Sequence, residues 1–348
     1  MIRCVRDLGK QAAAKYRPED LKAVIYGFPG ETVELKSNSS SLISLLDRIY
    51  RCFRSDGTAD STLYLLQDQG ESGVRFLAVD PGFNSFICTE PDQAVSFWGS
   101  QLMVDHLYRS RSLYLHSAVL GRDGKVHLFP GGSRSGKTTL ALKLSRAGYT
   151  YFSEEMAPLD VESGKVNPFP RSFLLRSDSL RLLPGVREES DKLPFFYDYQ
   201  ERASGEDNPP KRFIFSPTRL FSKVGGEALP VGGIFFLSGF CGGATRFRPL
   251  SSARALQLLV EYAVNPGYLD PPGGFTALET LISLAGRAPA FRVELGQLDE
   301  EPEALSRSLE EAMERGYDRR TGDLKLVARR CRQLFRQKAT LREGSNQK

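Results

Sequence analysis

Cysteine and histidine are scarce in this chain of 348 residues, which contains five cysteines and three histidines. The cysteines are odd in number, scattered and without C-x-x-C spacing, so the sequence excludes a disulfide framework and favours reduced thiols. The histidines do not stand at zinc-ligand spacing from the cysteines, and no structural zinc site is therefore expected.

Long hydrophobic runs are also missing. No apolar stretch approaches the ~20 residues that a bilayer-spanning helix needs, and the residues that follow Met1 contain no apolar signal-peptide core. With 41% hydrophobic and 26% charged residues, the composition is that of an ordinary globular protein. The sequence therefore predicts a cytoplasmic protein with no membrane partner.

Charge of neither sign dominates the chain, which has 47 lysines and arginines against 42 aspartates and glutamates and a net charge of +5. This mild excess suits a polyphosphate ligand or an acidic partner and does not require nucleic acid. Much of it lies between Arg319 and Arg342. A solvated helical tail is favoured there over a nucleic-acid interface.

The most informative feature that is present is the run GGSRSGKT at residues 131–138. It fits G-x-x-x-x-G-K-S/T, the phosphate-binding P-loop, in which backbone N–H groups cradle phosphate oxygens. Lys137 would reach the β- and γ-phosphates, and the Thr138 hydroxyl would bind Mg²⁺. The predicted nucleotide-binding residues are Gly131, Gly132, Ser133, Arg134, Ser135, Gly136, Lys137, Thr138 and Thr139.

The residues on either side of this loop support the assignment. Residues 126–129 form an apolar run that predicts a strand, and Leu140, Ala141 and Leu144 recur at helical spacing before Gly148 supplies a stop. Strand, glycine-rich loop and helix is the order that a P-loop requires, and it favours a nucleoside triphosphate as the ligand. The alternative is a Gly/Ser turn before an ordinary helix.

An acidic pair offers the carboxylates that the chemistry needs. Most P-loop enzymes hold Mg²⁺ with an Asp at the end of a later hydrophobic strand, but here the strand-like run 231–237 is followed by Ser238. The nearest acidic residues are Glu154 and Glu155, directly after residues 151–153. If that strand lies beside the P-loop strand, the pair faces the phosphates. One carboxylate would hold Mg²⁺ and the other accept a hydroxyl proton; the alternative is a solvated turn.

The segment from His116 to Asp160 resembles the kinase domain of HPr kinase/phosphorylase and its relatives. The shared order is a histidine before the loop, the P-loop, a helix that ends near Gly148, and an acidic pair whose first member follows Lys137 by 17 residues. The chain is more similar still to HPr-kinase-like proteins of peptide-modification gene clusters of the lasso-peptide type. The downstream signature of true HPr kinases is not visible, so HPr itself is not expected as the substrate.

The resemblance implies an α/β fold, with an HPr-kinase/phosphoenolpyruvate-carboxykinase-like P-loop domain and a smaller N-terminal α+β domain. Residues 1–110 would form the N-terminal domain, residues 111–300 the P-loop domain, and residues 301–348 a basic helical tail. The resemblance also implies ATP and Mg²⁺ as cofactors. It is compatible with a homo-oligomer, because HPr kinases assemble as oligomers.

Carried over residue by residue, the resemblance makes Glu154 the general base and a metal contact, and Glu155 a metal ligand together with Thr138. It places His116 near the transferring phosphate, beside Lys137. This chain has Glu-Glu where the family usually has at least one Asp. The additional methylene displaces the carboxylate, and a displacement of about 1 Å can lower a rate roughly 10²-fold.

The expected function is transfer of the γ-phosphate of ATP to a serine hydroxyl of a peptide or small protein. One alternative is a catalytically impaired nucleotide-binding module that presents a peptide to partner enzymes. Another is a small-molecule phosphotransferase, for which residues 187–210 would form a lid-like loop. A DNA-acting ATPase is least favoured, because no strand-end Asp and no nucleic-acid module is recognised.

The N-terminal part of the chain shows the pattern of a small α+β unit. Strand-like runs at residues 23–26 and 33–35 flank a Pro-Gly turn, and residues 42–49 have helical spacing. Two further strand-like runs, residues 63–66 and 74–79, flank a glycine turn and predict a hairpin.

Overall fold

The computed structural model describes residues 3–5, 15–70, 73–79, 85–89, 112–176, 195–196, 212–264, 275–296 and 300–315, with single positions between these ranges and at 327. Over these residues the chain is a mixed α/β protein with two large sheets and one small one. It divides into two compact units: Met1–His106 with Arg171–Pro217, and Leu107–Pro170 with Thr218–Lys348. The boundary expected near residue 110 did not account for the return of residues 171–217 to the first unit.

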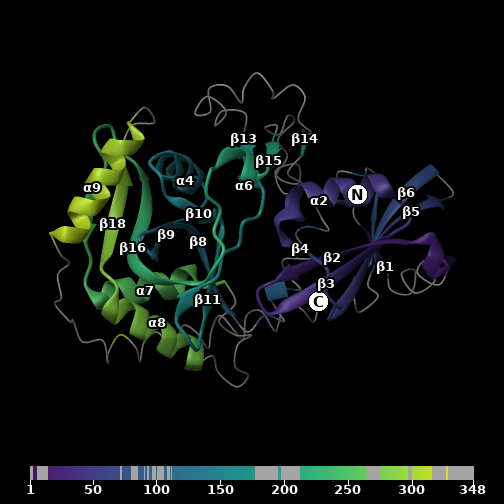
Figure 1. Cartoon of the computed structure of the whole chain (residues 1–348), viewed down its shortest axis with the longest axis horizontal. Coiled ribbons are helices and arrows are strands. Elements are labelled where there is room, and N and C mark those ends of the chain that lie inside the picture. The colour runs from purple at the N-terminus through teal and green to yellow at the C-terminus, as the bar shows by residue number, and fades with distance from the viewer. Residues whose placement is uncertain are drawn as a thin grey trace. The chain divides into compact units, whose positions relative to one another are not determined.

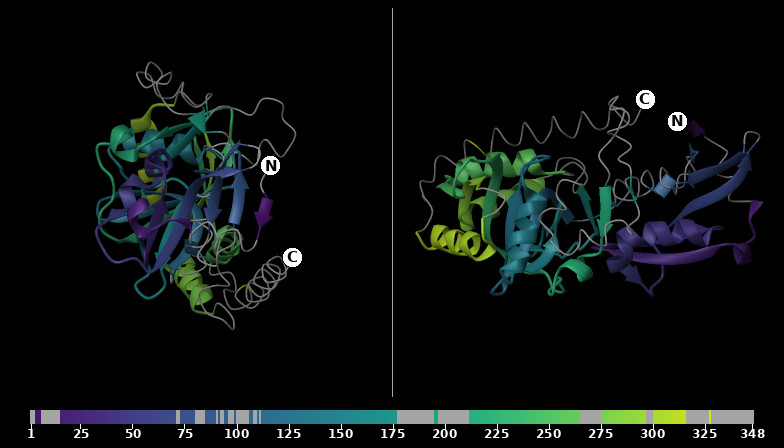
Figure 2. Two further views of the ribbon diagram at one scale, coloured as in Figure 1. Left: turned by 90° about the vertical axis from the view of Figure 1, so that its right-hand side faces the viewer. Right: turned by 90° about the horizontal axis from the view of Figure 1, so that it is seen from above.

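The first unit is built on a seven-stranded sheet with the order β1-β7-β6-β5-β3-β2-β4. Its strands are β1 (Arg3–Val5), β2 (Lys22–Phe28), β3 (Glu31–Ser37), β4 (Arg54–Ser55), β5 (Ser61–Gly70), β6 (Gly73–Val79) and β7 (Ser85–Cys88). The helix α2 (Ser40–Tyr50) lies along the β2–β3 hairpin (Figure 2). Short 3-10 helices span Pro18–Asp20 and Arg51–Phe53.

Local sequence explains these elements. Every second residue of β3 is buried, as expected for a strand with one face on a core, and Gly30 has the positive φ of +84° that the preceding turn requires. The strands expected at residues 23–26 and 33–35, the helix at 42–49 and the hairpin at 63–79 are confirmed.

A small sheet of β13 (Phe173–Arg176), β15 (Arg212–Phe215) and β14 (Phe195–Phe196) belongs to the same unit. The expectation of a loop over residues 187–210 was therefore wrong at residues 195–196, which pair with β15. The rest of that segment lies outside the described residues. The short helix α6 (Pro217–Leu220) follows β15.

The second unit contains an eight-stranded sheet (Figure 1). Its strands are β8 (Ser112–Arg122), β9 (Lys125–Pro130), β10 (Thr150–Ser153), β11 (Met156–Asp160), β12 (Lys165–Val166), β16 (Leu229–Phe240), β17 (Arg246–Pro249) and β18 (Ala290–Leu295). Strand β9 lies between β8 and β16. It runs parallel to β16, which runs parallel to β18, so these three strands end at the same edge of the sheet.

Helices cover both faces of this sheet (Figure 1). Val126 and Leu128 of β9 join the apolar cluster formed with α7 (Ser252–Tyr262) and α8 (Phe275–Arg287). Phe129 points to the opposite face and stacks on Phe235 at 5.3 Å between ring centroids. That second face carries α4 (Lys137–Arg146) and α9 (Pro302–Glu314), which contact each other. Because successive side chains of β9 point to opposite faces of the sheet, helices pack on both faces, and the unit has three layers in the order α/β/α.

The helix α9 is the first part of the expected C-terminal tail, and it is bonded to strand β8 of this unit. Arg122 of β8 donates to the Ser306 hydroxyl and forms an ion pair with Glu310, each at 2.6 Å. The basic residues beyond 315 lie outside the described residues, and of this stretch the structure describes only Val327. No helix among the residues that the structure describes is both long enough and apolar enough to span a bilayer.

His127 is a buried titratable group in the central strand β9. Its side chain lies near the rings of Tyr149 and Phe235, and burial is the largest cause that lowers its pKa from 6.5 to about 4. The unfolded chain therefore takes up a proton near pH 6.5, whereas the folded chain does so only near pH 4. Stability rises with pH across this window and is lost on acidification.

We expect the His127→Leu variant to lose part of the acid sensitivity of the wild type. Between pH 7 and pH 4 the difference amounts to about 3 kcal/mol in the free energy of unfolding, because each unit of pKa shift corresponds to about 1.4 kcal/mol. Denaturant unfolding of both proteins at several pH values measures it. An identical acid dependence in the two proteins would contradict the assignment to His127.

Candidate functional site

Residues 131–136 connect the end of β9 to the start of α4, so the expected order of strand, loop and helix is confirmed. Gly131 continues the sheet through an isolated bridge to Leu237 of β16. Gly136 has φ of +98° and immediately precedes α4. The loop is therefore held at both ends, by the sheet on one side and by the helix on the other.

Two positions of this loop accept only glycine, because any larger side chain would clash with its neighbours. A Cβ at Gly131 would collide with the Ser135 hydroxyl, and a Cβ at Gly136 would collide with Leu295 and come within 3.0 Å of the Phe240 ring. Gly132, in contrast, has open space around the position of a Cβ. The outer part of the loop, residues 132–134, is exposed, so its backbone is accessible to a ligand at the N-terminus of α4.

Lys137 lies back over the loop. Its ammonium donates to the carbonyl oxygens of Gly131 at 2.7 Å and Gly132 at 2.9 Å. Burial lowers its pKa, whereas the charges of Glu154 and Glu155 act in the opposite direction and favour the ammonium form. The positive charge of Lys137 is thus placed between the glycine-rich loop and the acidic pair.

Thr138 contacts the first member of this pair. Its hydroxyl donates to Oε1 of Glu154. The turn that presents the pair is organised by the buried Ser153, whose hydroxyl accepts from the N–H groups of Glu155 at 3.4 Å and Met156 at 3.1 Å. This turn leads from β10 directly into β11.

The strand that carries the pair does not lie beside the P-loop strand. Strand β8 is inserted between β9 and β10 and pairs with both in antiparallel fashion, which differs from the arrangement considered in the sequence analysis. Strands β9 and β10 therefore run parallel to each other, and their C-terminal ends reach the same edge of the sheet. For this reason the glutamates still meet the P-loop.

His116 lies in β8 opposite Met156 of β11. Burial and the charge of Lys137 lower its pKa below the ordinary value, and Glu155 opposes them. The neutral imidazole is therefore favoured at pH 7. The charges of Lys137 and Glu155 thus act on His116 in opposite directions.

An open pocket of about 350 Å³ lies next to this cluster. It is lined by residues from three segments, namely His116 of β8, Glu155 and Met156 before and in β11, and Glu261, Tyr262, Ala263 and Val264 at the end of α7. Glu155 thus lines the pocket, whereas Glu154 contacts Thr138. The two carboxylates occupy different surroundings although they are adjacent in the sequence.

The pocket-lining end of α7 was not identified from the sequence. The helix itself has a local signal, because the Ser251 hydroxyl caps it and Leu256, Leu259 and Val260 recur at helical spacing. No motif marks Glu261 or Tyr262, because they join the site only through the pairing of residues 263–264 with β8. This is a tertiary contact without a local signal.

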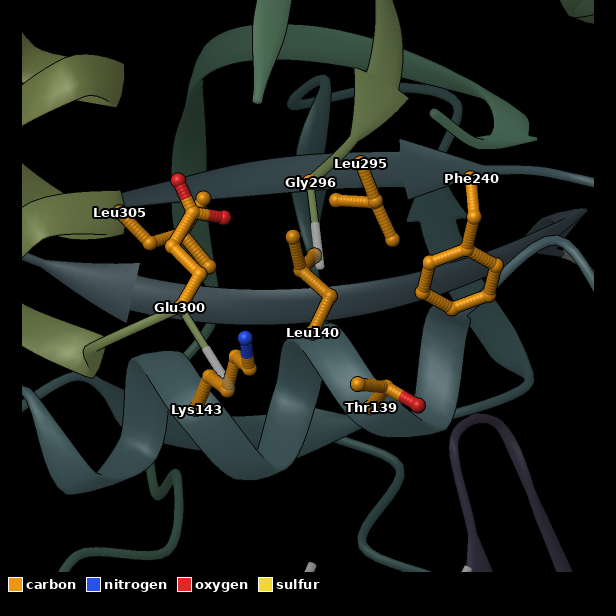
Figure 3. Close-up of a pocket in the computed structure, with 8 residues that line it drawn as sticks. All are labelled: Thr139, Leu140, Lys143, Phe240, Leu295, Gly296, Glu300 and Leu305. Atoms are coloured by element: carbon orange, nitrogen blue, oxygen red, sulfur yellow. The ribbon is translucent and has the colours of Figure 1, made fainter. Parts of the chain in front are cut away.

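A second, much smaller pocket of about 10 Å³ lies between α4 and the ends of β16 and β18. Figure 3 shows Thr139, Leu140 and Lys143 of α4 on one side of it and Leu295 and Gly296 on the other. Its volume is too small for more than a water molecule. No sequence motif marks the strand ends that line it.

Comparisons with known proteins leave the family open. No family model matches the chain, and no curated protein matches it. The resemblance to HPr-kinase-like proteins therefore stays a prediction from residues 116–160.

We expect Gly136→Ala to lower the free energy of unfolding by at least about 1 kcal/mol, because alanine is strained at positive φ and its methyl group would collide with Leu295. Gly132→Ala is the matched control, with an expected change within about 0.5 kcal/mol. Denaturant unfolding of the three proteins measures both effects. Equal losses in the two variants would contradict this account of the loop.

Proposed function

We propose that this protein is an ATP- and Mg²⁺-dependent kinase with an HPr-kinase-like P-loop fold, which transfers the γ-phosphate to a serine hydroxyl of a peptide or small protein. One observation carries the proposal. The lysine and hydroxyl of a P-loop, a pair of carboxylates and a histidine gather at one edge of a sheet, next to an open pocket. The lysine, the hydroxyl and the carboxylates are groups that phosphoryl transfer uses to bind phosphates, hold Mg²⁺ and accept a proton.

The loop and Lys137 bind the phosphates. The exposed backbone of residues 132–134 and the positive end of the α4 dipole attract phosphate oxygens. Lys137 exchanges its bonds to the carbonyls of Gly131 and Gly132 for bonds to the β- and γ-phosphates. Its charge then stabilises the negative charge that develops on the transferring group.

Thr138 and Glu154 fit a Mg²⁺ ion. Both present oxygen atoms, and Mg²⁺ prefers one or two carboxylates completed by substrate phosphates and water. Among the described residues no group of three or more His, Cys, Asp and Glu side chains is arranged to hold a metal alone, which agrees with a site completed by the nucleotide. When bound, the ion neutralises charge on the β- and γ-phosphates.

Glu155 is better placed than Glu154 to act as the base. It lines the pocket with His116, whereas Glu154 is engaged by the Thr138 hydroxyl. This division keeps Glu154 as a metal contact and moves the role of base, which the resemblance implied for Glu154, to Glu155. The contact of Glu154 with Thr138 also shows that the additional methylene of glutamate does not prevent the carboxylate from reaching the P-loop.

The open pocket of about 350 Å³ receives the acceptor. The serine oxygen forms a bond to the γ-phosphorus, its proton passes to the Glu155 carboxylate, and the bond from the γ-phosphorus to the β–γ bridging oxygen breaks to release ADP. His116, neutral because of its lowered pKa, orients the hydroxyl. Glu155 and Glu261 make the pocket acidic, which favours an acceptor with a neighbouring basic group.

We expect Lys137→Ala to lower phosphate transfer at least about 10²-fold, because a preorganised positive donor is removed, and to weaken ATP binding. Mass spectrometry of candidate peptides measures transfer, and calorimetry measures binding. Lys125→Ala, at the exposed start of β9, is the control and should behave as the wild type. ATP binding that does not depend on Lys137 would contradict the P-loop assignment. Binding that depends on Lys137 without transfer by the wild type would support the non-catalytic module.

Substitution of the two glutamates should have different kinetic effects. We expect Glu154→Gln to raise the Mg²⁺ concentration needed for half-maximal activity. Glu155→Gln should lower kcat by about 10²- to 10⁴-fold and abolish the rise of the rate with pH that a base produces as it loses its proton. Initial rates across Mg²⁺ concentration and pH measure both. The reverse pattern would restore Glu154 as the base and Glu155 as the metal ligand.

A further inference from the structure

Phe240 is exposed at the end of β16. Among the residues whose side chains the structure describes, it and Val74 are the two large apolar side chains that remain exposed, each with 48% of its surface accessible. A single exposed apolar side chain needs no explanation by itself. The position of Phe240, however, is set by an irregularity in strand β16, and its side chain lies against the P-loop.

A β-bulge sets the direction of Phe240. Strands β16 and β18 pair in register up to Leu237 and Val293, and the register then shifts so that Phe240 pairs with Leu295. Gly239 lies inside this irregularity with φ of +107°. Bulges re-aim side chains and are frequent beside active sites.

The ring of Phe240 is in contact with the loop that binds phosphates in the proposed function. A Cβ built on Gly136 would lie 3.0 Å from its Cζ atom. Figure 3 shows the ring beside Thr139 in the first turn of α4, with Leu295 close by. The aromatic side chain thus stands next to the residues that follow the P-loop lysine.

The backbone around Phe240 is held by several contacts. Cys241 N–H donates to the Leu295 carbonyl at 2.7 Å, and Gly296 N–H donates to the Thr245 hydroxyl at 2.8 Å. Glu300 accepts from the N–H and the hydroxyl of Thr245. These bonds fix residues 240–245 against the end of β18, so the ring is presented by an ordered segment.

The order of the strands shows on which side of the proposed phosphate site Phe240 lies. Strands β9, β16 and β18 are parallel, and ligands of such sheets bind outside their C-terminal ends. The carboxylates and the acceptor pocket lie on the side of β8 and β11, beyond one side of β9. The ends of β16 and β18 lie on the other side of β9.

We propose that Phe240 stacks on the base of the nucleoside triphosphate, with the base lying over the ends of β16 and β18. The inference rests on the proposed function, since it takes the P-loop as the phosphate site. The adjacent pocket of about 10 Å³ is too small for a base, so the contact is made on the exposed ring and not by insertion. Stacking tolerates any base, because every base has a π-face.

The experiment measures binding of ATP, GTP and inorganic tripolyphosphate in the presence of Mg²⁺. We expect Phe240→Ala to weaken ATP and GTP roughly ten-fold, the scale of one lost stacking contact, and to leave tripolyphosphate unchanged. Phe240→Trp should retain nucleotide affinity, with quenching of the new tryptophan by the base. Val74→Ala controls for the loss of an equally exposed apolar side chain elsewhere.

Other outcomes separate this inference from the proposed function. Unchanged ATP affinity in Phe240→Ala would overturn the stacking contact, and so would an equal loss for tripolyphosphate, which would mean that the ring only supports the P-loop. Lys137→Ala is the second arm, and it should weaken all three ligands. If it weakens none, the P-loop assignment fails, and the inference about Phe240 fails with it.

Discussion

The site depends on the hydrogen bonding of one strand, β8. Its residue Ser117 pairs with Pro130, the last residue of β9, and its N–H donates to the Glu155 carbonyl at 3.1 Å. The neighbouring His116 pairs with Met156. Three segments of the candidate site, namely the start of the glycine-rich loop, the acidic turn and the strand that carries His116, are therefore aligned by two consecutive residues of one backbone. The relative positions of these groups are fixed by main-chain geometry and owe little to side-chain flexibility.

Charge in the site is arranged around Lys137. Burial lowers the pKa of Lys137, and the charges of the two glutamates oppose this shift without cancelling it. Burial and the charge of Lys137 lower the pKa of His116, and Glu155 opposes them. A buried charge is stabilised when it is paired and costly when it is alone. The cluster consequently favours a neutral imidazole at His116.

Much of this arrangement could be predicted where the signal is local. The glycines of the P-loop, the apolar strand before it and the helix after it follow from steric and periodic rules that act within a few residues, and Glu154 and Glu155 stand out as the nearest carboxylates. What could not be predicted depends on contacts between distant segments. The insertion of β8 between β9 and β10, the end of α7 in the pocket and the different surroundings of the two glutamates all arise from strand pairing, for which the sequence carries no short-range pattern.

The bonds of Lys137 to Gly131 and Gly132 have a consequence for selectivity. A ligand at this loop does not meet a bare charge; it competes with two carbonyl oxygens that already accept from the ammonium. Its binding is an exchange reaction, and the net gain is the difference between the new and the old acceptors. In the proposed function this exchange favours a chain of phosphates, because it offers the ammonium several charged oxygens at once.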